Sequence, residues 1–216
     1  RVGLSEIIAA HDFISHGLRQ FRESEPAVVL ELWSMGSMAQ IRALKEGTLD
    51  VGLVYDAHLD DRDDGVLECA PLGFGETMLA VHESHPLAAR KSVTMAELAD
   101  EPVLGPTRQT APGYYDRLMA ALIQSGRAPR IVQECTTNSI LLSLVSVGMG
   151  IGFVTASGSN PPAHNIRLVP ISDLGLKFQV QLVWRKRDGS AALQRFIEMM
   201  QDEAQGAQKQ AVPLLG

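Results

Sequence analysis

Hydroxyl and amide side chains recur where predicted strands end and predicted helices begin. Ser37, Thr107 and Asn138 each stand at such a junction, and Arg108 follows Thr107 directly. The free amides and the positive dipole end of a helix start favour an anion, and a guanidinium adds forked hydrogen bonds. This is the chemistry of binding a small organic anion. Each of the three polar residues is also a good N-cap, which stabilises a helix by about 1 kcal/mol without any ligand, so capping alone would explain each of them.

The elements that would position Ser37 are the clearest in the chain. Residues 28–33 and 50–54 are apolar and predict two strands, with an amphipathic helix between them. Ser37 stands three residues before Gln40, the spacing of a capping box. Gly47 supplies a left-handed stop for the helix. Strand, helix and strand this close together predict a βαβ unit, whose ligands bind beyond the carboxyl ends of the strands.

The remainder of the chain repeats this alternation of strands and helices. Residues 66–81 predict two apolar strands joined at 73–76. Thr94 and Glu97 have the spacing of a second capping box. Residues 139–147 predict a helix that is apolar nearly all round and therefore deeply buried, with a stop at Gly148. The predicted fold class is α/β, with mostly parallel, doubly wound sheets.

Two places where the chain crosses between halves indicate two Rossmann-like lobes joined by two crossing strands. Lobe I is expected to hold 1–73 plus 177–204, and lobe II 74–176. The segment 205–216 is expected to be a disordered tail. This organisation would place the ligand in a cleft between the lobes.

The motifs of catalysis, cofactor binding and metal binding are missing or incomplete. No GxSxG nucleophile elbow occurs, and the glycines at 148–152 lack the third glycine of a dinucleotide loop. The acidic run at 56–65 resembles a calcium loop, but Arg62 and Pro71 occupy ligand positions, so a solvated surface loop is expected. The histidines show no convincing metal spacing, and His82 and His85 are read as surface residues. We therefore expect no enzyme, no cofactor and no metal.

The composition is that of a globular protein and argues against a nucleic-acid-binding or membrane-spanning chain. The 216 residues are 45% hydrophobic and 20% charged, which is ordinary for a globular chain. A net charge of −6 argues against direct contact with nucleic acid. Cys69 and Cys135 form no disulfide framework, and no apolar run approaches the ~20 residues that span a bilayer. A cytoplasmic protein without membrane contact is expected.

Several segments, taken in order, resemble the effector-binding domain of LysR-type transcriptional regulators. They are RVGLSE with GLRQFRESEP, LELWSMGSMAQIRALKEGTLDVGLV, PLGFGETMLAVHESHPLA and TTNSILLSLVSVGMGIGFVT. The resemblance extends from Arg1 to about Ala204. The Met-Gly-Ser at 35–37 is especially similar to the branch that senses intermediates of aromatic-compound breakdown.

The resemblance implies a type II periplasmic-binding-protein fold with a small effector between the lobes. It also implies a homodimer of this domain, a homotetramer of the intact protein, and DNA binding only through an N-terminal winged helix-turn-helix that this sequence does not contain. The positions that it implies for the ligand are Ser5, Glu6, Ile7, Gly36, Ser37, Met38, Pro106, Thr107, Arg108 and Asn138. Glu6 departs from the small or hydroxyl residues usual in that loop, and a carboxylate there disfavours an anionic effector unless Arg108 pairs with it.

Two other functions share this scaffold. A periplasmic solute-binding protein of an uptake system is the alternative, although the two lone cysteines and the HPLA segment argue against it. An enzyme on the same scaffold would need a catalytic constellation, and the sequence offers none.

Overall fold

The structure is a computed structural model that describes residues 1–55, 65–109, 112–124, 130–156 and 164–210. The described residues fall into two compact units. Unit 1 holds those of 1–75 and those from 178 onward, and unit 2 holds those of 76–156 and 164–177. The predicted surface loop at 56–65 lies, apart from Gly65, outside the described residues.

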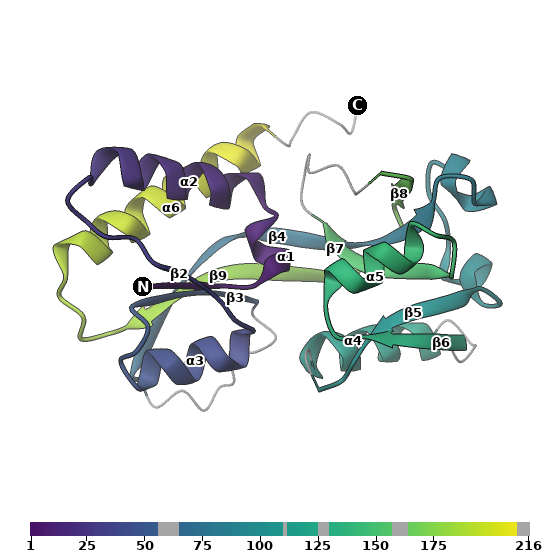
Figure 1. Ribbon diagram of the computed structural model, residues 1–216, viewed down its shortest axis with the longest axis horizontal. Coiled ribbons are helices and arrows are strands. Elements are labelled where there is room, and N and C mark those ends of the chain that lie inside the picture. The colour runs from purple at the N-terminus through teal and green to yellow at the C-terminus, as the bar shows by residue number, and fades with distance from the viewer. Residues whose placement is uncertain (56–64, 110–111, 125–129, 157–163, 211–216) are drawn as a thin grey trace. The chain divides into compact units, whose positions relative to one another are not determined.

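Unit 1 is built around three parallel strands, in which the central strand pairs with a neighbour on each side. Strand β1 (Val2–Leu4) pairs in parallel with β2 (Leu32–Ser34) and β3 (Val51–Tyr55), and β3 pairs antiparallel with β9 (Lys177–Arg185). Figure 1 shows the helices of this unit on both faces of the strands. They are α1 (Glu6–Ala9), α2 (Asp12–Ser24), α3 (Ser37–Lys45) and α6 (Ala191–Gln210).

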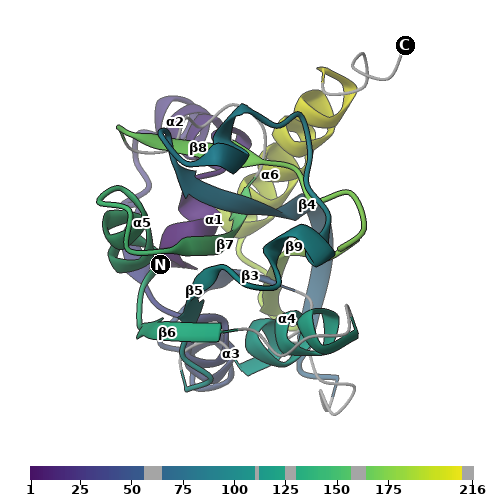
Figure 2. The same cartoon turned by 90° about the vertical axis from the view of Figure 1, so that its right-hand side faces the viewer.

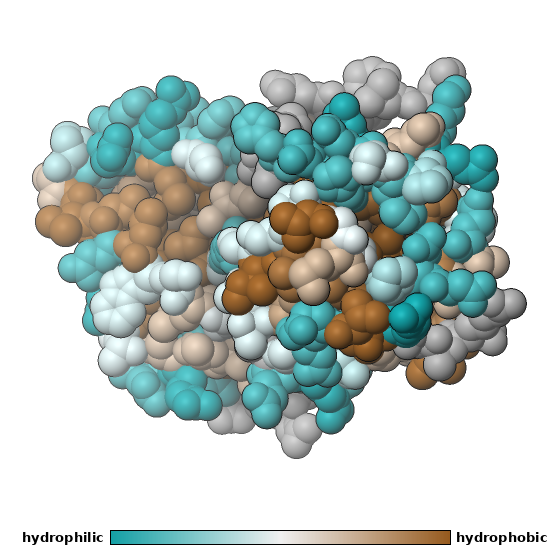
Figure 3. All heavy atoms as spheres, turned by 45° about the vertical axis from the view of Figure 1, so that its right-hand side comes forward, coloured by the Kyte–Doolittle hydropathy of each residue, from teal (hydrophilic) through white to brown (hydrophobic). Residues whose placement is uncertain are grey.

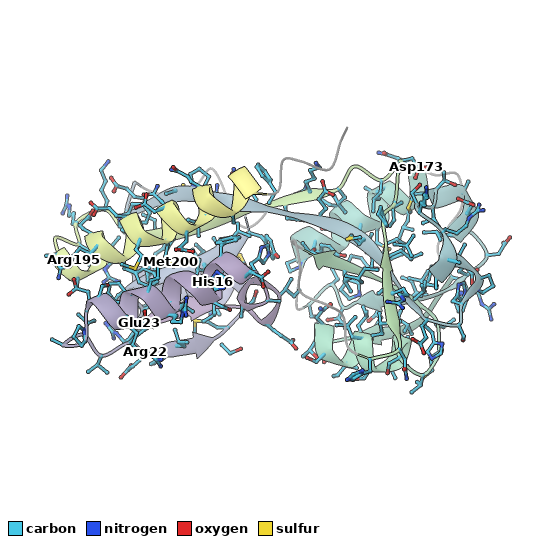
Figure 4. The ribbon with its side chains drawn as sticks, turned by 90° about the horizontal axis from the view of Figure 1, so that it is seen from above. His16, Arg22, Glu23, Asp173, Arg195 and Met200 are labelled. Carbon is cyan, nitrogen blue, oxygen red and sulfur yellow. The ribbon has the colours of Figure 1, made fainter. Side chains whose placement is uncertain are left out.

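The helices α2 and α6 pack side by side over one face of unit 1. The rings of Phe21 and Phe196 meet edge to face with centroids 5.0 Å apart. Met200 of α6 lies beside α2 (Figure 4), and a Cβ on Gly17 would come within 2.5 Å of its sulfur. A side chain at position 17 would therefore force Met200 to move. On the opposite face, Leu44 of α3 is fully buried.

Unit 2 repeats the arrangement. Strand β5 (Pro102–Pro106) lies between its parallel partners β6 (Arg130–Cys135) and β7 (Ile151–Ala156). Strand β4 (Leu67–His82) pairs antiparallel with β7 and with β8 (Ile166–Val169). Figure 2 shows α4 (Pro112–Gln124) and α5 (Asn138–Val145) on either side of these strands. The short 3-10 helices η2 (Pro86–Ala89) and η3 (Met95–Leu98) complete the unit.

The core of unit 2 has two parts, one between the strands and α4 and the other between the strands and α5. Phe153 packs in the same cluster as Leu118 and Leu122 of α4. The next residue along the strand, Val154, packs with Leu141 of α5. Successive side chains of a strand point to opposite faces, so the strands are buried on both sides, as the apolar sequence predicts.

Several local predictions are confirmed. Gly47 and Gly148 have φ of 75° and 76°, the left-handed conformation expected of a helix stop. The capping box at Thr94 is present, since the Glu97 carboxylate accepts the Thr94 amide at 2.8 Å. Asp173, labelled in Figure 4, accepts the amide of Met95 at 2.9 Å and reinforces this helix start.

Three predictions about elements are wrong. The two strands expected at 66–81 form the single strand β4, which runs unbroken through 73–76 and has β9 and β7 as its neighbours in the sheet. Helix α5 is buried only on one face, and Ile140 is 45% exposed. The expected tail begins too early, because α6 continues to Gln210 through glutamine, alanine and lysine, which are good helix formers.

Candidate functional site

The first group of predicted site residues lies at the carboxyl ends of β1 and β2. Leu4 stands opposite Ser34 in the parallel register, and the Met35 amide donates to the Leu4 carbonyl at 3.0 Å. The loops that enter α1 and α3 therefore leave the sheet as neighbours. This register brings six predicted positions of unit 1 to one edge, namely Ser5, Glu6, Ile7, Gly36, Ser37 and Met38.

Helix α3 begins without a side-chain cap. Gly36 occupies the N-cap position, and Ser37 is the first helical residue. The capping box predicted for Ser37 and Gln40 is therefore wrong. Gln40 instead turns into the core, where it is fully buried, and its Nε2 donates to the Met35 carbonyl at 2.9 Å. The first amides of α3 are consequently not covered by a capping side chain.

Two strand glycines let α3 lie this close to the sheet. A Cβ on Gly52 would come within 2.9 Å of Gln40 Oε1, and one on Gly3 within 3.0 Å of Gln40 Cγ. Gln40 thus fills the space above both glycines and fixes the Met35 carbonyl that precedes the helix. The sequence analysis missed this positioning role. A polar residue on the apolar side of the predicted helix was the available signal.

Two serines at this edge are used differently. The Ser5 hydroxyl accepts the amide of Ile8 at 3.3 Å and caps α1. Ser37 is 8% exposed, and its hydroxyl forms no hydrogen bond with another described residue. Met38 beside it is 55% exposed. The edge therefore offers a buried hydroxyl and uncapped amides beside an exposed apolar side chain, a combination suited to an anionic group on an apolar body.

The second group lies at the carboxyl ends of β5 and β6 in unit 2. Pro106 stands opposite Cys135, and the Thr107 amide donates to the Cys135 carbonyl at 3.2 Å. This register brings Pro106, Thr107 and Arg108 near the start of α5. Thr137, not Asn138, is the N-cap there, because its hydroxyl accepts the Ile140 amide at 3.2 Å. Asn138 is the first helical residue, and Thr107 lies too far before α4 to cap it.

Arg108 is already paired inside unit 2. Its Nε and Nη2 donate to the two carboxylate oxygens of Asp116 at 2.8 Å and 3.0 Å. The guanidinium holds the pKa of Asp116 below its usual range, and the carboxylate raises the pKa of Arg108. Both side chains are exposed. Within its own unit, Arg108 thus forms a fork-to-fork ion pair with Asp116.

The described residues offer neither a metal centre nor a membrane-spanning helix. Within these ranges, no three His, Cys, Asp or Glu side chains come together as metal ligands. No described helix has both the length and the apolar character needed to cross a membrane. Burial lowers the pKa of His11 to about 4. It lies at the start of α2, with Nε2 3.5 Å from the Tyr55 hydroxyl.

Comparison with known proteins agrees with this geometry. The family model of the LysR substrate binding domain matches residues 1–205. The uncharacterized HTH-type transcriptional regulator YnfL of Escherichia coli is 32% identical over 86% of this chain and 61% of its own length. BenM of Acinetobacter baylyi, also an HTH-type transcriptional regulator, is 32% identical over 71% of this chain and 50% of its own. The chain thus spans between half and two thirds of the length of these relatives.

Solved structures give the same fold. The effector-binding domain of BenM with its effector benzoate superposes with a TM-score of 0.80 at 27% identity, covering 94% of this chain and 90% of that one. The effector-binding domain of QuiR in complex with shikimate, at 20% identity, shares the fold with a TM-score of 0.79, covering 95% and 96% of the two chains. The fold is thus the type II periplasmic-binding-protein fold, as predicted.

These relatives are regulators, so the alternative of an uptake-system solute-binding protein is not supported. The match from residue 1 to residue 205 leaves little of the chain outside the family. The chain belongs to the LysR family and constitutes its substrate-binding domain.

Proposed function

We propose that this chain is the effector-sensing domain of a LysR-type transcriptional regulator and that it binds a small organic carboxylate. The observation that carries the proposal is the start of α3, where the buried Ser37 hydroxyl and uncapped amides stand together. The benzoate bound by the BenM domain supports an aromatic acid as one candidate. The second group, which consists of Pro106, Thr107, Arg108 and Asn138, stays a prediction for further contacts to the effector.

The α3 start suits a carboxylate for three physical reasons. The positive end of the helix dipole lies there, the first amides need acceptors, and the Ser37 hydroxyl can donate to an anion. Gln40 keeps these groups in place by holding the Met35 carbonyl. A hydrogen bond to a charged group is worth about 1.5–3 kcal/mol. Loss of one such bond therefore corresponds to about a tenfold to hundredfold loss of affinity.

The experiment is calorimetry with a panel of aromatic carboxylates, including benzoate, and of ring-cleavage diacids. Ser37→Ala is expected to weaken the best ligand by about tenfold to a hundredfold. Ser15→Ala, on the exposed side of α2, is the matched control and is expected to change nothing. Thr107→Val tests the second group. If Ser37→Ala and Thr107→Val both bind the best ligand as tightly as the wild type, the site assignment is wrong.

The proposal extends to the regulator that contains this domain. An N-terminal winged helix-turn-helix binds DNA, and the effector changes transcription because it prefers one conformation of the protein. A coupling of about 1–3 kcal/mol is typical of such control. The intact regulator works on DNA in the cytoplasm and needs no catalytic step. A reporter gene under its control should lose its effector response in Ser37→Ala while basal DNA binding is kept.

We further propose that this domain forms homodimers and the intact protein homotetramers. Apolar side chains reach the surface among hydrophilic ones (Figure 3). Near the edge strand β2, Val29, Leu32 and Trp33 are 82%, 53% and 42% exposed. An edge strand with exposed apolar residues favours association with another chain. Sedimentation should show a dimer that Leu32→Lys weakens, and a monomer at high micromolar concentration would contradict the proposal.

A further inference from the structure

Glu6 is the one charged residue in the two loops that form the candidate site of unit 1. Residues 4–8 and 34–40 contain no lysine, arginine or histidine. Glu6 is exposed and forms no hydrogen bond or ion pair with another described residue. It opens α1, but α1 already has its cap in the Ser5 hydroxyl. The carboxylate of Glu6 is therefore neither neutralised nor needed as a cap within the described residues.

The loop register puts this carboxylate at the same edge as the α3 start. Glu6 is two residues beyond Leu4, and Gly36 is two residues beyond Ser34, the partner of Leu4 in the register. Neighbouring strands lie about 5 Å apart. A purely anionic effector on the α3 amides would then meet a like charge at short range, which weakens binding by about tenfold.

The one cation among the predicted ligand positions already has a partner. Arg108 is the only other charged residue among the predicted ligand positions, and its Nε and Nη2 both donate to the Asp116 carboxylate. That pair lies within unit 2 and leaves Glu6 without a counter-ion from the predicted set. Among the predicted ligand positions, no other residue can supply the counter-charge, which leaves the ligand as its source.

From this geometry we infer that the effector is a zwitterion, with an ammonium group close to its carboxylate, as in an α-amino acid. The carboxylate binds at the start of α3 and the ammonium group at Glu6. The inference rests on the proposed function and adds the chemical class of the ligand. Glu6 is thus the residue that discriminates an amino acid from the carboxylic acid that lacks the amine.

The test compares the twenty common amino acids with the matching acids that lack the α-amino group. One such pair is phenylalanine and 3-phenylpropanoate. Affinities are measured by calorimetry at neutral pH on the 216-residue chain. The variants are Glu6→Gln, which removes only the charge, and Glu46→Gln as the control. Glu46 is an exposed glutamate at the opposite end of α3.

The wild type and Glu46→Gln should bind at least one amino acid about tenfold or more tightly than its deaminated partner. Glu6→Gln should weaken the amino acid and strengthen the partner, so that their ratio changes by at least about tenfold. The inference is overturned if no amino acid binds, or if Glu6→Gln leaves the ratio unchanged.

Ser37→Ala separates this inference from the proposed site. If Ser37→Ala weakens amino acid and deaminated acid alike, the α3 site is supported, whatever Glu6 does. If Ser37→Ala has no effect while Glu6→Gln abolishes the preference, the zwitterion is supported and the α3 assignment fails.

Discussion

The close approach of α3 to the sheet makes Gly52→Ala the sharpest test of how the site is positioned. A Cβ at this residue would lie 2.9 Å from Gln40 Oε1 and 3.2 Å from Leu44 Cδ1. Both neighbours are fully buried. Gln40 is held further by its 2.9 Å hydrogen bond to the Met35 carbonyl. Neither side chain can therefore move aside without disturbing the core or the loop before α3.

The magnitude follows from two opposing effects. Overpacking of a well-packed site costs about 1–3 kcal/mol, whereas replacing a glycine lowers the entropy of the unfolded chain and returns about 0.4–1 kcal/mol. We expect Gly52→Ala to lower the free energy of unfolding by about 1–2 kcal/mol, measured by urea denaturation. Gly105→Ala is the control, because the nearest atoms to its Cβ, on Ile131, lie 3.8 Å and 3.9 Å away. That variant should be neutral or slightly stabilised.

Combining Gly52→Ala with Gln40→Ala tests whether Gln40 is the side chain that the new methyl group displaces. Gln40→Ala removes the atom that the new methyl group meets, so the double variant should be more stable than the sum of the two single effects predicts, by about 1 kcal/mol. Gly52→Ala should also weaken the effector, because Gln40 positions the Met35 carbonyl. If Gly52→Ala proves as stable as Gly105→Ala, or if the two effects add, the packing argument is wrong.

Two further predictions concern stability. Burial lowers the pKa of His11 from 6.5 to about 4, so between these pH values the imidazole is protonated in the unfolded chain but not in the folded one. The stability of the folded state is therefore highest above about pH 6.5, and about 3 kcal/mol of it is lost as the pH falls to 4. His11→Leu should flatten this part of the pH–stability profile, and the exposed His16→Leu should not. Gly148→Ala should cost about 1–2 kcal/mol in urea denaturation, because φ is +76° there, whereas Gly189→Ala, which has open space and ordinary φ, should not destabilise.

The two predicted capping boxes show when the spacing of residues is enough to predict a helix cap. Thr94 with Glu97 and Ser37 with Gln40 share the same spacing. The first forms because Glu97 stays at the surface, where it accepts the Thr94 amide. The second does not form because burial above the strand glycines takes the Gln40 side chain away from the helix start. Spacing predicts a cap only where no buried site competes for the side chain.

The other differences between prediction and structure also come from contacts between residues that lie far apart in the sequence. The glycines at 47 and 148 were predicted because their conformation depends on a few neighbouring residues. The strand β4 pairs with strands from 151–156 and 166–169 and neighbours 177–185, all far along the chain. The Arg108–Asp116 pair joins a loop to a helix that begins after it, so no single motif contains both residues. The sequence could identify the loops of the proposed site, but not that Arg108 in one of them is paired with Asp116.

The missing cap of α3 leads to a last prediction, in which stability and binding change in opposite directions. Helices α1 and α5, which also follow strand ends, carry side-chain caps from Ser5 and Thr137, whereas α3 has Gly36. The backbone of Gly36 is extended, at φ −70° and ψ 157°, and a Cβ there meets nothing within 4 Å. Gly36→Asp can therefore be accommodated, and its carboxylate can accept the free amides.

We expect Gly36→Asp to stabilise unit 1 by a few tenths of a kcal/mol, since aspartate is a better N-cap and complements the helix dipole. The same carboxylate occupies the amides proposed for the effector and repels its charge, so affinity should fall by more than about tenfold. Gly36→Ala adds the Cβ without an acceptor and should keep most of the affinity. Calorimetry and urea denaturation on the three proteins decide the matter. If Gly36→Asp binds the best carboxylate as tightly as the wild type, the effector does not use the start of α3.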